Sequence, residues 1–146
     1  MSNRQITIAV DAMGGENSPL KCLKGIEIFS SKKPDVNFKI FGDEFLISKS
    51  LKNNNLQINN YEIISCVENV LDDDNASTIL RSRKNSSIYQ GLSFVKENSE
   101  SGFVSAGNTA ALMILSRLIL GMINGVNRPA ICSKIPSHKS FSLMMD

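Results

Sequence analysis

Two short runs of small and polar residues each lie between a strand-like run and a helix-like run. The first is Asp11–Gly15 (DAMGG) and the second is Ser105–Thr109 (SAGNT). Backbone N–H groups at the start of a helix have no partners within the helix, and they carry the positive end of the helix dipole. Because small residues let an anion approach these groups, each run predicts a phosphate or oxyanion site.

The second run holds the first catalytic candidate. The side-chain amide of Asn108, with the backbone N–H groups of Gly107, Asn108 and Thr109, is predicted to bind phosphate or to stabilise an oxyanion. Ser105 belongs to the same set of phosphate-binding candidates. The alternative is an ordinary strand-to-helix turn in which Asn108 is only the N-cap of the helix, and the residues alone leave the two interpretations equally open.

The first run adds a glycine pair and a carboxylate. Gly14 and Gly15 permit positive φ and close approach of a phosphate ligand, although a tight turn without a ligand explains them equally well. Asp11 is the second catalytic candidate. A carboxylate beside phosphate is unfavourable unless a cation lies between them, so we expect Asp11 to orient a basic group or a water, or to cap the turn.

Composition limits the function classes. The chain has 146 residues, 42% of them hydrophobic and 21% charged, with a net charge of +2, which excludes a strongly basic nucleic-acid-binding protein. The three cysteines (Cys22, Cys66 and Cys132) fit neither a disulfide framework nor a zinc site and indicate a reducing compartment. No signal-peptide pattern is present, and Ala110–Leu120 is too short for a membrane span, so we expect a cytoplasmic protein.

Strand-like and helix-like runs alternate along the chain, which predicts one α/β domain over residues 1–146. Its expected architecture is a three-layer α/β/α sandwich with a mostly parallel sheet, in which both small-residue turns lie at carboxyl ends of strands. The expected strands are Ile6–Val10, Phe38–Phe41, Tyr61–Ser65 and Phe103–Ser105. The expected helices are Leu20–Ser30, Glu44–Leu51, a helix that ends at Glu97, and Asn108–Ile123. Ser18 is the expected N-cap of the first, with Pro19 at the first helical position, and Asn85 or Ser86 is the expected cap of the third.

The last part of the chain is unusually apolar. The predicted helix Asn108–Ile123 is apolar on all sides, which indicates either a central core helix or a helix covered by a second subunit. Ala130–Ile135 and Phe141–Met145 predict a hairpin, and its second run reads as a buried strand with nothing after it to cover it. We therefore expect a truncated chain.

Four motifs together resemble a known family, the phosphate acyltransferases of bacterial phospholipid synthesis (the PlsX family). They occur in the family's order and at about its spacing, and the similarity extends over the whole chain. The motifs are Asp11–Gly15 with Pro19, then Arg81-x-Arg83-Lys84-x-Ser86-Ser87, then Ser105–Leu112 (SAGNTAAL), and Arg128-Pro129-Ala130.

The resemblance implies transfer of a fatty acyl group from acyl carrier protein to inorganic phosphate, giving an acyl phosphate. It also implies a homodimer at the periphery of the membrane, no metal and no cofactor. The implied fold is similar to that of isocitrate and isopropylmalate dehydrogenases and of phosphotransacetylase. Arg81 and Lys84 would then bind phosphate, the pantetheine phosphate or the acidic carrier, although a solvated helix end is the alternative for such a cluster.

A second hypothesis stays open beside the acyltransferase: a non-catalytic anion-binding α/β fragment that dimerises through its apolar helix. A dinucleotide or P-loop site lacks its fingerprint here, because neither GxGxxG nor GxxxxGK[ST] occurs. His138 is the only histidine and lies in a polar turn, where we expect a solvated side chain. Asp72, Asp73 and Asp74 are adjacent in a predicted loop, where carboxylates are usually only solvated.

Overall fold

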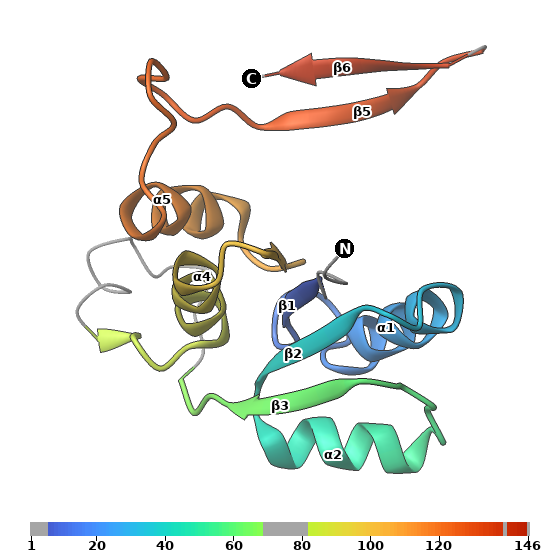
Figure 1. The fold of residues 1–146 in the computed structure, drawn as a ribbon. Coiled ribbons are helices and arrows are strands. Elements are labelled where there is room, and N and C mark those ends of the chain that lie inside the picture. Colours follow the sequence, from blue (N-terminus) through green and yellow to red (C-terminus); the bar gives the residue numbers. More distant parts are fainter. Residues whose placement is uncertain (1–5, 69–81, 139, 146) are drawn as a thin grey trace, which may run out of the picture.

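The computed structural model describes residues 6–68, 82–138 and 140–145 and contains a four-stranded, fully parallel sheet (Figure 1). The strand order is β3-β2-β1-β4, so β1 lies inside the sheet between β2 and β4. The strands are β1 (Thr7–Asp11), β2 (Asn37–Gly42), β3 (Tyr61–Ser65) and β4 (Ser101–Val104). This arrangement confirms the predicted α/β class with its mostly parallel sheet.

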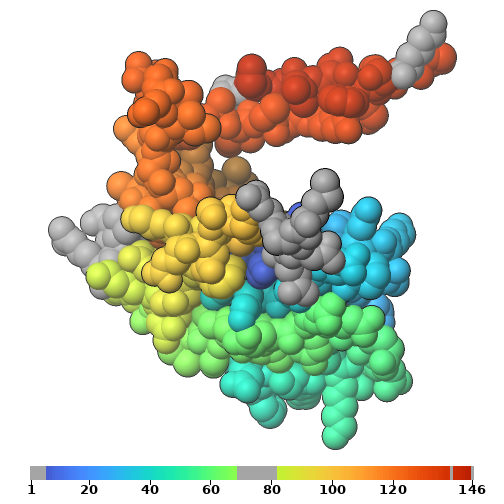
Figure 2. All heavy atoms as spheres, in the orientation of Figure 1, coloured from blue at the N-terminus to red at the C-terminus, as the bar shows by residue number. Residues whose placement is uncertain are grey.

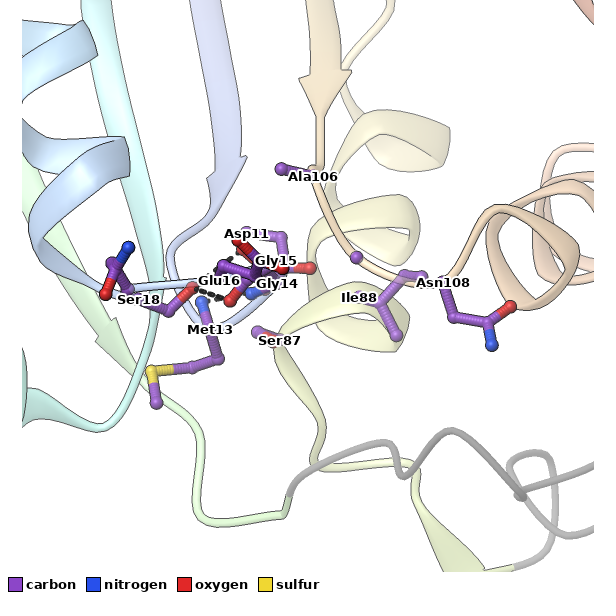
Figure 3. Close-up of a pocket in the computed structure, with 12 residues that line it drawn as sticks. Asp11, Met13, Gly14, Gly15, Glu16, Ser18, Ser87, Ile88, Ala106 and Asn108 are labelled. Atoms are coloured by element: carbon purple, nitrogen blue, oxygen red, sulfur yellow. Dashed lines mark hydrogen bonds between the residues drawn. The ribbon is translucent and has the colours of Figure 1, made fainter.

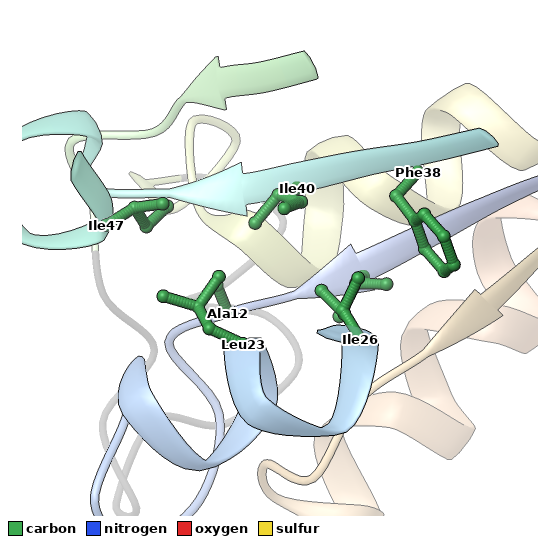
Figure 4. Packing of buried hydrophobic residues seen from close by; sticks show 7 residues of the cluster. Ala12, Leu23, Ile26, Phe38, Ile40 and Ile47 are labelled. Atoms are coloured by element: carbon green, nitrogen blue, oxygen red, sulfur yellow. The ribbon is translucent and has the colours of Figure 1, made fainter. Parts of the chain in front are cut away.

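The helices of the first half cover one face of the sheet. They are α1 (Leu20–Lys32) and α2 (Glu44–Asn53), and Asp43 caps α2 by accepting a hydrogen bond from the N–H of Leu46 at 2.9 Å. Apolar side chains of α1, α2, β1 and β2 form one core on this face (Figure 4). Its fully buried members are Val10, Ala12, Leu23, Ile26, Phe38, Ile40 and Ile47.

The opposite face is covered by α4 (Ser87–Glu97). Phe94 and Val95 of α4 pack on a cluster formed by Ala9, Phe41 and Cys66. Close packing of α4 on β4 leaves no room for a side chain at Gly91, where a Cβ would lie 2.2 Å from the Phe103 ring. Helices therefore lie on both faces of the sheet, as predicted.

The apolar helix α5 (Thr109–Ile119) packs on α4 rather than on the sheet. Ala111, Leu115 and Ile119 are buried there, whereas Leu118 and Leu120 are exposed. The prediction of a helix running to Ile123 was wrong, and within this chain the helix is buried on one face only. The helix ends earlier because Gly121 adopts a positive φ of 86°, and α4 covers only one of its faces.

The last two strands form an antiparallel hairpin of β5 (Cys132–Pro136) and β6 (Phe141–Met145), which confirms the predicted pairing. The hairpin projects beyond the rest of the molecule, as Figures 1 and 2 show. All described residues of both strands are exposed. Phe141–Met145 was expected to have the apolar character of a buried strand with nothing after it to cover it, and in this structure no other described element packs on it.

Among the helices of the described residues, none has the length and apolar character needed to cross a bilayer.

Candidate functional site

A pocket of about 720 Å³ opens where the chain leaves β1 and β4 (Figure 3). Its walls come from the turn after β1, the turn after β4 and the start of α4. The described residues that line it are Asp11, Met13, Gly14, Gly15, Glu16, Asn17, Ser18, Ser87, Ile88, Ala106, Gly107 and Asn108. The two turns expected to share a ligand therefore do line one cavity, at the carboxyl edge of the sheet.

The Asp11 carboxylate accepts hydrogen bonds from both turns. Its Oδ1 accepts hydrogen bonds from the N–H groups of Met13 (3.0 Å) and Gly14 (3.1 Å), and its Oδ2 accepts one from the Ser105 hydroxyl (2.7 Å). The Ser105 Oγ in turn accepts a hydrogen bond from the N–H of Gly107 at 3.0 Å. Asp11 is only 3% exposed, so these three donors replace the water that a charged carboxylate loses on burial.

The glycines allow the two backbones to touch. A Cβ on Gly14 would lie 2.6 Å from both Asp11 Oδ2 and the Gly107 nitrogen, and one on Gly15 would lie 2.7 Å from the Ala106 carbonyl oxygen. Gly15 also has a φ of 85°, as predicted, whereas Gly14 does not adopt a positive φ. The close approach that the glycines permit is thus between the two turns themselves.

Ser18 does not have the capping role expected of it. Its hydroxyl donates to the carbonyl oxygens of Gly14 (2.7 Å) and Gly15 (2.8 Å), within the turn that precedes α1. The N-cap of α1 is Pro19, which makes no side-chain capping bond. The sequence placed the cap one residue early, because a serine before a proline matches the usual capping pattern.

Asn108 is the N-cap of α5. Its Oδ1 accepts a hydrogen bond from the N–H of Ala111 at 2.9 Å, and its backbone carbonyl accepts the first helical bond, from Leu112. The capping role is therefore confirmed, whereas a role in ligand binding stays a prediction. Oδ1 is engaged in the cap and Asn108 still lines the pocket, so the Nδ2 amide is the part of this side chain left for a ligand.

The start of α4 is a third wall that the sequence analysis did not single out as a ligand site. Ser87 and Ile88 occupy the first two helical positions and line the pocket, and Ser86 caps the helix through its hydroxyl, which accepts from the N–H of Tyr89 at 3.4 Å. The signal was present in the serine pair before an amphipathic run. Two helix N-termini, those of α4 and α5, thus abut one pocket and favour an anion there.

Other predicted site residues lie elsewhere. Thr109 does not line this pocket but an apolar hollow between α5 and residues 120–131. Lys84 is exposed and is not part of the pocket wall, although it precedes Ser87 by only three positions. Arg81 and the three aspartates 72–74 lie outside the described residues. His138 is exposed in the hairpin turn, as expected.

The thiols near the sheet are unreactive in character. Burial raises the pKa of Cys22 to about 11, with a further rise from the nearby Asp11 charge. Burial likewise raises the pKa of Cys66 to about 11, opposed by a hydrogen bond from the backbone of Gly42. Cys132 is exposed. In the part of the chain that the structure describes, no three His, Cys, Asp or Glu side chains gather as a candidate metal site.

Comparison with solved structures supports the fold. EutD phosphotransacetylase from Staphylococcus aureus superposes with a TM-score of 0.61 over 96% of this chain and 45% of that one, at 20% identity. At this identity the similarity concerns the fold alone. Phosphotransacetylase was among the folds that the family resemblance implied, whereas the similarity to isocitrate dehydrogenases stays a prediction.

Sequence comparison identifies the family. Proteins named phosphate acyltransferase are 36% identical over 95% of the chain in Caldicellulosiruptor saccharolyticus, 38% over 97% in Magnetococcus marinus and 42% over 97% in the Wolbachia strain of Culex pipiens. The chain covers 42%, 40% and 43% of the lengths of these three relatives. The family model described as "Fatty acid synthesis protein" matches residues 6–146. The chain therefore belongs to the fatty acid synthesis protein family.

Proposed function

We propose that this protein contributes the phosphate-binding half of an enzyme that transfers a fatty acyl group from acyl carrier protein to inorganic phosphate. One observation carries the proposal: a single pocket is bounded by two glycine-bearing turns and two helix N-termini. Helix N-termini favour anions because their first N–H groups have no partner within the helix, whereas the N–H groups of Met13, Gly14 and Gly107 bond within the two turns. The relatives named phosphate acyltransferase supply the reaction type.

In the proposed reaction, phosphate is itself the nucleophile. A phosphate oxygen attacks the thioester carbonyl, the new C–O bond forms, and the C–S bond breaks as the tetrahedral intermediate collapses. The pantetheine sulfur leaves as a thiolate and takes a proton from solvent or from the attacking phosphate. The enzyme's task is to hold phosphate beside the carbonyl and to stabilise the oxyanion with fixed donors.

The residues around the pocket take different parts in this proposal. The Asn108 Nδ2 amide and the free first-turn N–H groups contact phosphate or the oxyanion. Asp11 and Ser105 act as positioning residues, because their hydrogen bonds run between the two turns rather than into open space. Gly14 and Gly107 permit the contact between the turns. Arg81 and Lys84 remain candidates for the carrier or its phosphopantetheine arm.

An assay of acyl phosphate formation tests the proposal. The chain is incubated with acyl carrier protein charged with a fatty acid and with phosphate, and the product is trapped with hydroxylamine as the hydroxamate. We expect hydroxamate that depends on phosphate, and less of it with Asn108→Ala at unchanged helical content by circular dichroism. Hydroxamate formation at the same rate without phosphate would contradict the proposal.

The alternative, a non-catalytic anion-binding protein that dimerises through its apolar helix, has one observation in its favour. The face of α5 that α4 leaves uncovered carries exposed Leu118. The cytoplasmic homodimer at the membrane periphery that the resemblance implies would use the same face. Light scattering after size exclusion tests both: a Leu118→Lys variant should shift a dimer toward monomer, and a monomeric wild type would exclude this dimer.

A further inference from the structure

The Ser87 hydroxyl has no hydrogen-bond partner among the described residues, although Ser87 is only 5% exposed. Among the described residues, every side-chain N or O atom that is fully shielded from solvent has a hydrogen-bond partner. Because the Ser87 hydroxyl has none, its oxygen must be accessible from a cavity. Ser87 lines the pocket, and Figure 3 shows its side chain leaving α4 toward the Gly14-Gly15 turn. A hydroxyl that faces the pocket and makes no bond within the fold can donate to a ligand there.

The neighbouring serines are all engaged. The Ser86 hydroxyl donates to the Arg83 carbonyl oxygen at 2.6 Å while capping α4, and Ser105 donates to Asp11. Ser18, the other described serine in the pocket wall, donates to the carbonyl oxygens of its own turn. Ser87 therefore differs from these serines in having a donor that the fold itself does not use.

The electrostatics at Ser87 favour an anion. The first helical bond of α4 runs from the N–H of Gln90 to the Ser86 carbonyl, so the N–H groups of Ser87 and Ile88 have no partner within the helix. Two carboxylates also line the pocket. Asp11 is already bound by three donors, and the exposed Glu16 is screened by solvent.

We propose that Ser87 is a phosphate-binding residue, whose hydroxyl donates to a phosphate oxygen together with the N–H of Ile88. The anion then lies against the start of α4, facing the glycine turn. This assignment rests on the proposed function in one respect, that the anion is phosphate. It explains why α4 begins at the pocket with a serine that caps nothing.

Isothermal titration of inorganic phosphate into wild type, Ser87→Ala and Ser86→Ala tests the assignment. Ser86→Ala is the matched control, because it removes an adjacent buried hydroxyl that caps the helix and does not line the pocket. A hydrogen bond to a charged ligand implies that Ser87→Ala raises the dissociation constant for phosphate about tenfold or more. The same variant should keep the melting temperature of wild type, since alanine is tolerated at the first helical position.

The control should show the opposite pattern. Loss of the cap in Ser86→Ala should lower the melting temperature by about 2–4 °C and change phosphate affinity less than Ser87→Ala does. Equal phosphate affinity in wild type and Ser87→Ala, or no saturable binding to wild type, would overturn the assignment. Phosphate binding that depends on Ser87 without acyl phosphate formation would instead contradict the proposed reaction and leave the assignment intact.

Discussion

At the scale of single residues, Asp11 and Gly14 decide whether the two turns meet. Asp11 supplies the only carboxylate that bonds to both turns in the described structure, and Gly14 lets the backbone of the second turn come within contact distance. Neither feature requires a ligand. The pocket is therefore organised before phosphate arrives, which is the condition for donors that stabilise a transition state without reorganising.

Removing the Asp11 carboxylate should loosen this contact. Asp11→Ala leaves two part-buried N–H groups and the Ser105 hydroxyl without their acceptor, so we expect a loss of about 2–4 kcal/mol in the free energy of unfolding. Asp11→Asn keeps one oxygen acceptor and should lose less. Urea denaturation measures both variants, and an Asp11→Ala variant as stable as wild type would refute the role of this side chain.

A methyl group at Gly14 should separate the turns. Its Cβ would lie 2.6 Å from the Gly107 nitrogen, a backbone atom that cannot move without its chain, so Gly14→Ala should weaken phosphate binding and destabilise the fold. The matched control is Gly25→Ala in α1, where nothing lies within 4 Å of the added Cβ. That variant should gain about 0.5–1 kcal/mol, because alanine is the better helix former. Equal effects of the two substitutions would contradict the packing described here.

At the scale of elements, α4 links the sheet to α5. One side of α4 packs on β1 and β4, while Ile88 and Leu92 contact the buried side of α5. The start of α5 carries Asn108 and the start of α4 carries Ser87, so packing between these two helices fixes the spacing of the two N-termini at the pocket. A substitution that disturbs the packing of α4 on α5 should therefore change the geometry of the pocket.

Truncating the buried side of α5 tests this dependence. Leu115→Ala removes a side chain with no exposed surface and should cost about 2–5 kcal/mol, whereas Leu118→Ala, 52% exposed, should change stability by less than about 0.5 kcal/mol. Thermal unfolding gives the stabilities. If α5 were instead buried on both faces, the two substitutions would be similarly costly.

The sequence predicted which segments form helices and strands better than it predicted how those segments pack. Strands β1 to β4 and the hairpin follow from apolar runs between glycine, proline and polar turns, and Tyr61–Ser65 was placed to the residue. The extent of α5 was misjudged, and an all-apolar helix does not reveal which of its faces pack within this chain. Ser87 was missed as a ligand candidate since only the structure shows that its hydroxyl, unlike that of Ser86, has no partner among the described residues.

At the scale of the whole molecule, the sheet and its helices form one packed unit from which the hairpin projects (Figure 2). Exposed apolar side chains gather on the hairpin, with Leu143 63% and Met145 72% exposed. Half-buried Cys22 and buried Cys66 lie within the packed unit, on opposite faces of the sheet. Their ionisation therefore reports on the integrity of the fold.

Alkaline pH should destabilise the protein through these thiols. Unfolded cysteines ionise near their ordinary pKa of 9.0, whereas folded Cys22 and Cys66 retain their protons until about pH 11. Between these values the unfolded state binds fewer protons, so the free energy of unfolding should fall as pH rises from 9 to 11. Urea titrations across this range should show a shallower fall in a Cys22→Ala/Cys66→Ala variant. An equal slope in the variant would refute the contribution of these thiols.

The central claim is that phosphate binds where the two glycine turns and the two helix N-termini meet. Nitrogen-15 NMR of the labelled chain during a phosphate titration tests it most directly, because each backbone N–H reports separately. We predict saturable shifts largest at Ser87, Ile88, Asn108 and the N–H groups of the Gly14-Gly15 turn, with the same anion producing little change in the hairpin. Shifts that are absent from these amides, or that centre on exposed lysines elsewhere, would contradict the account.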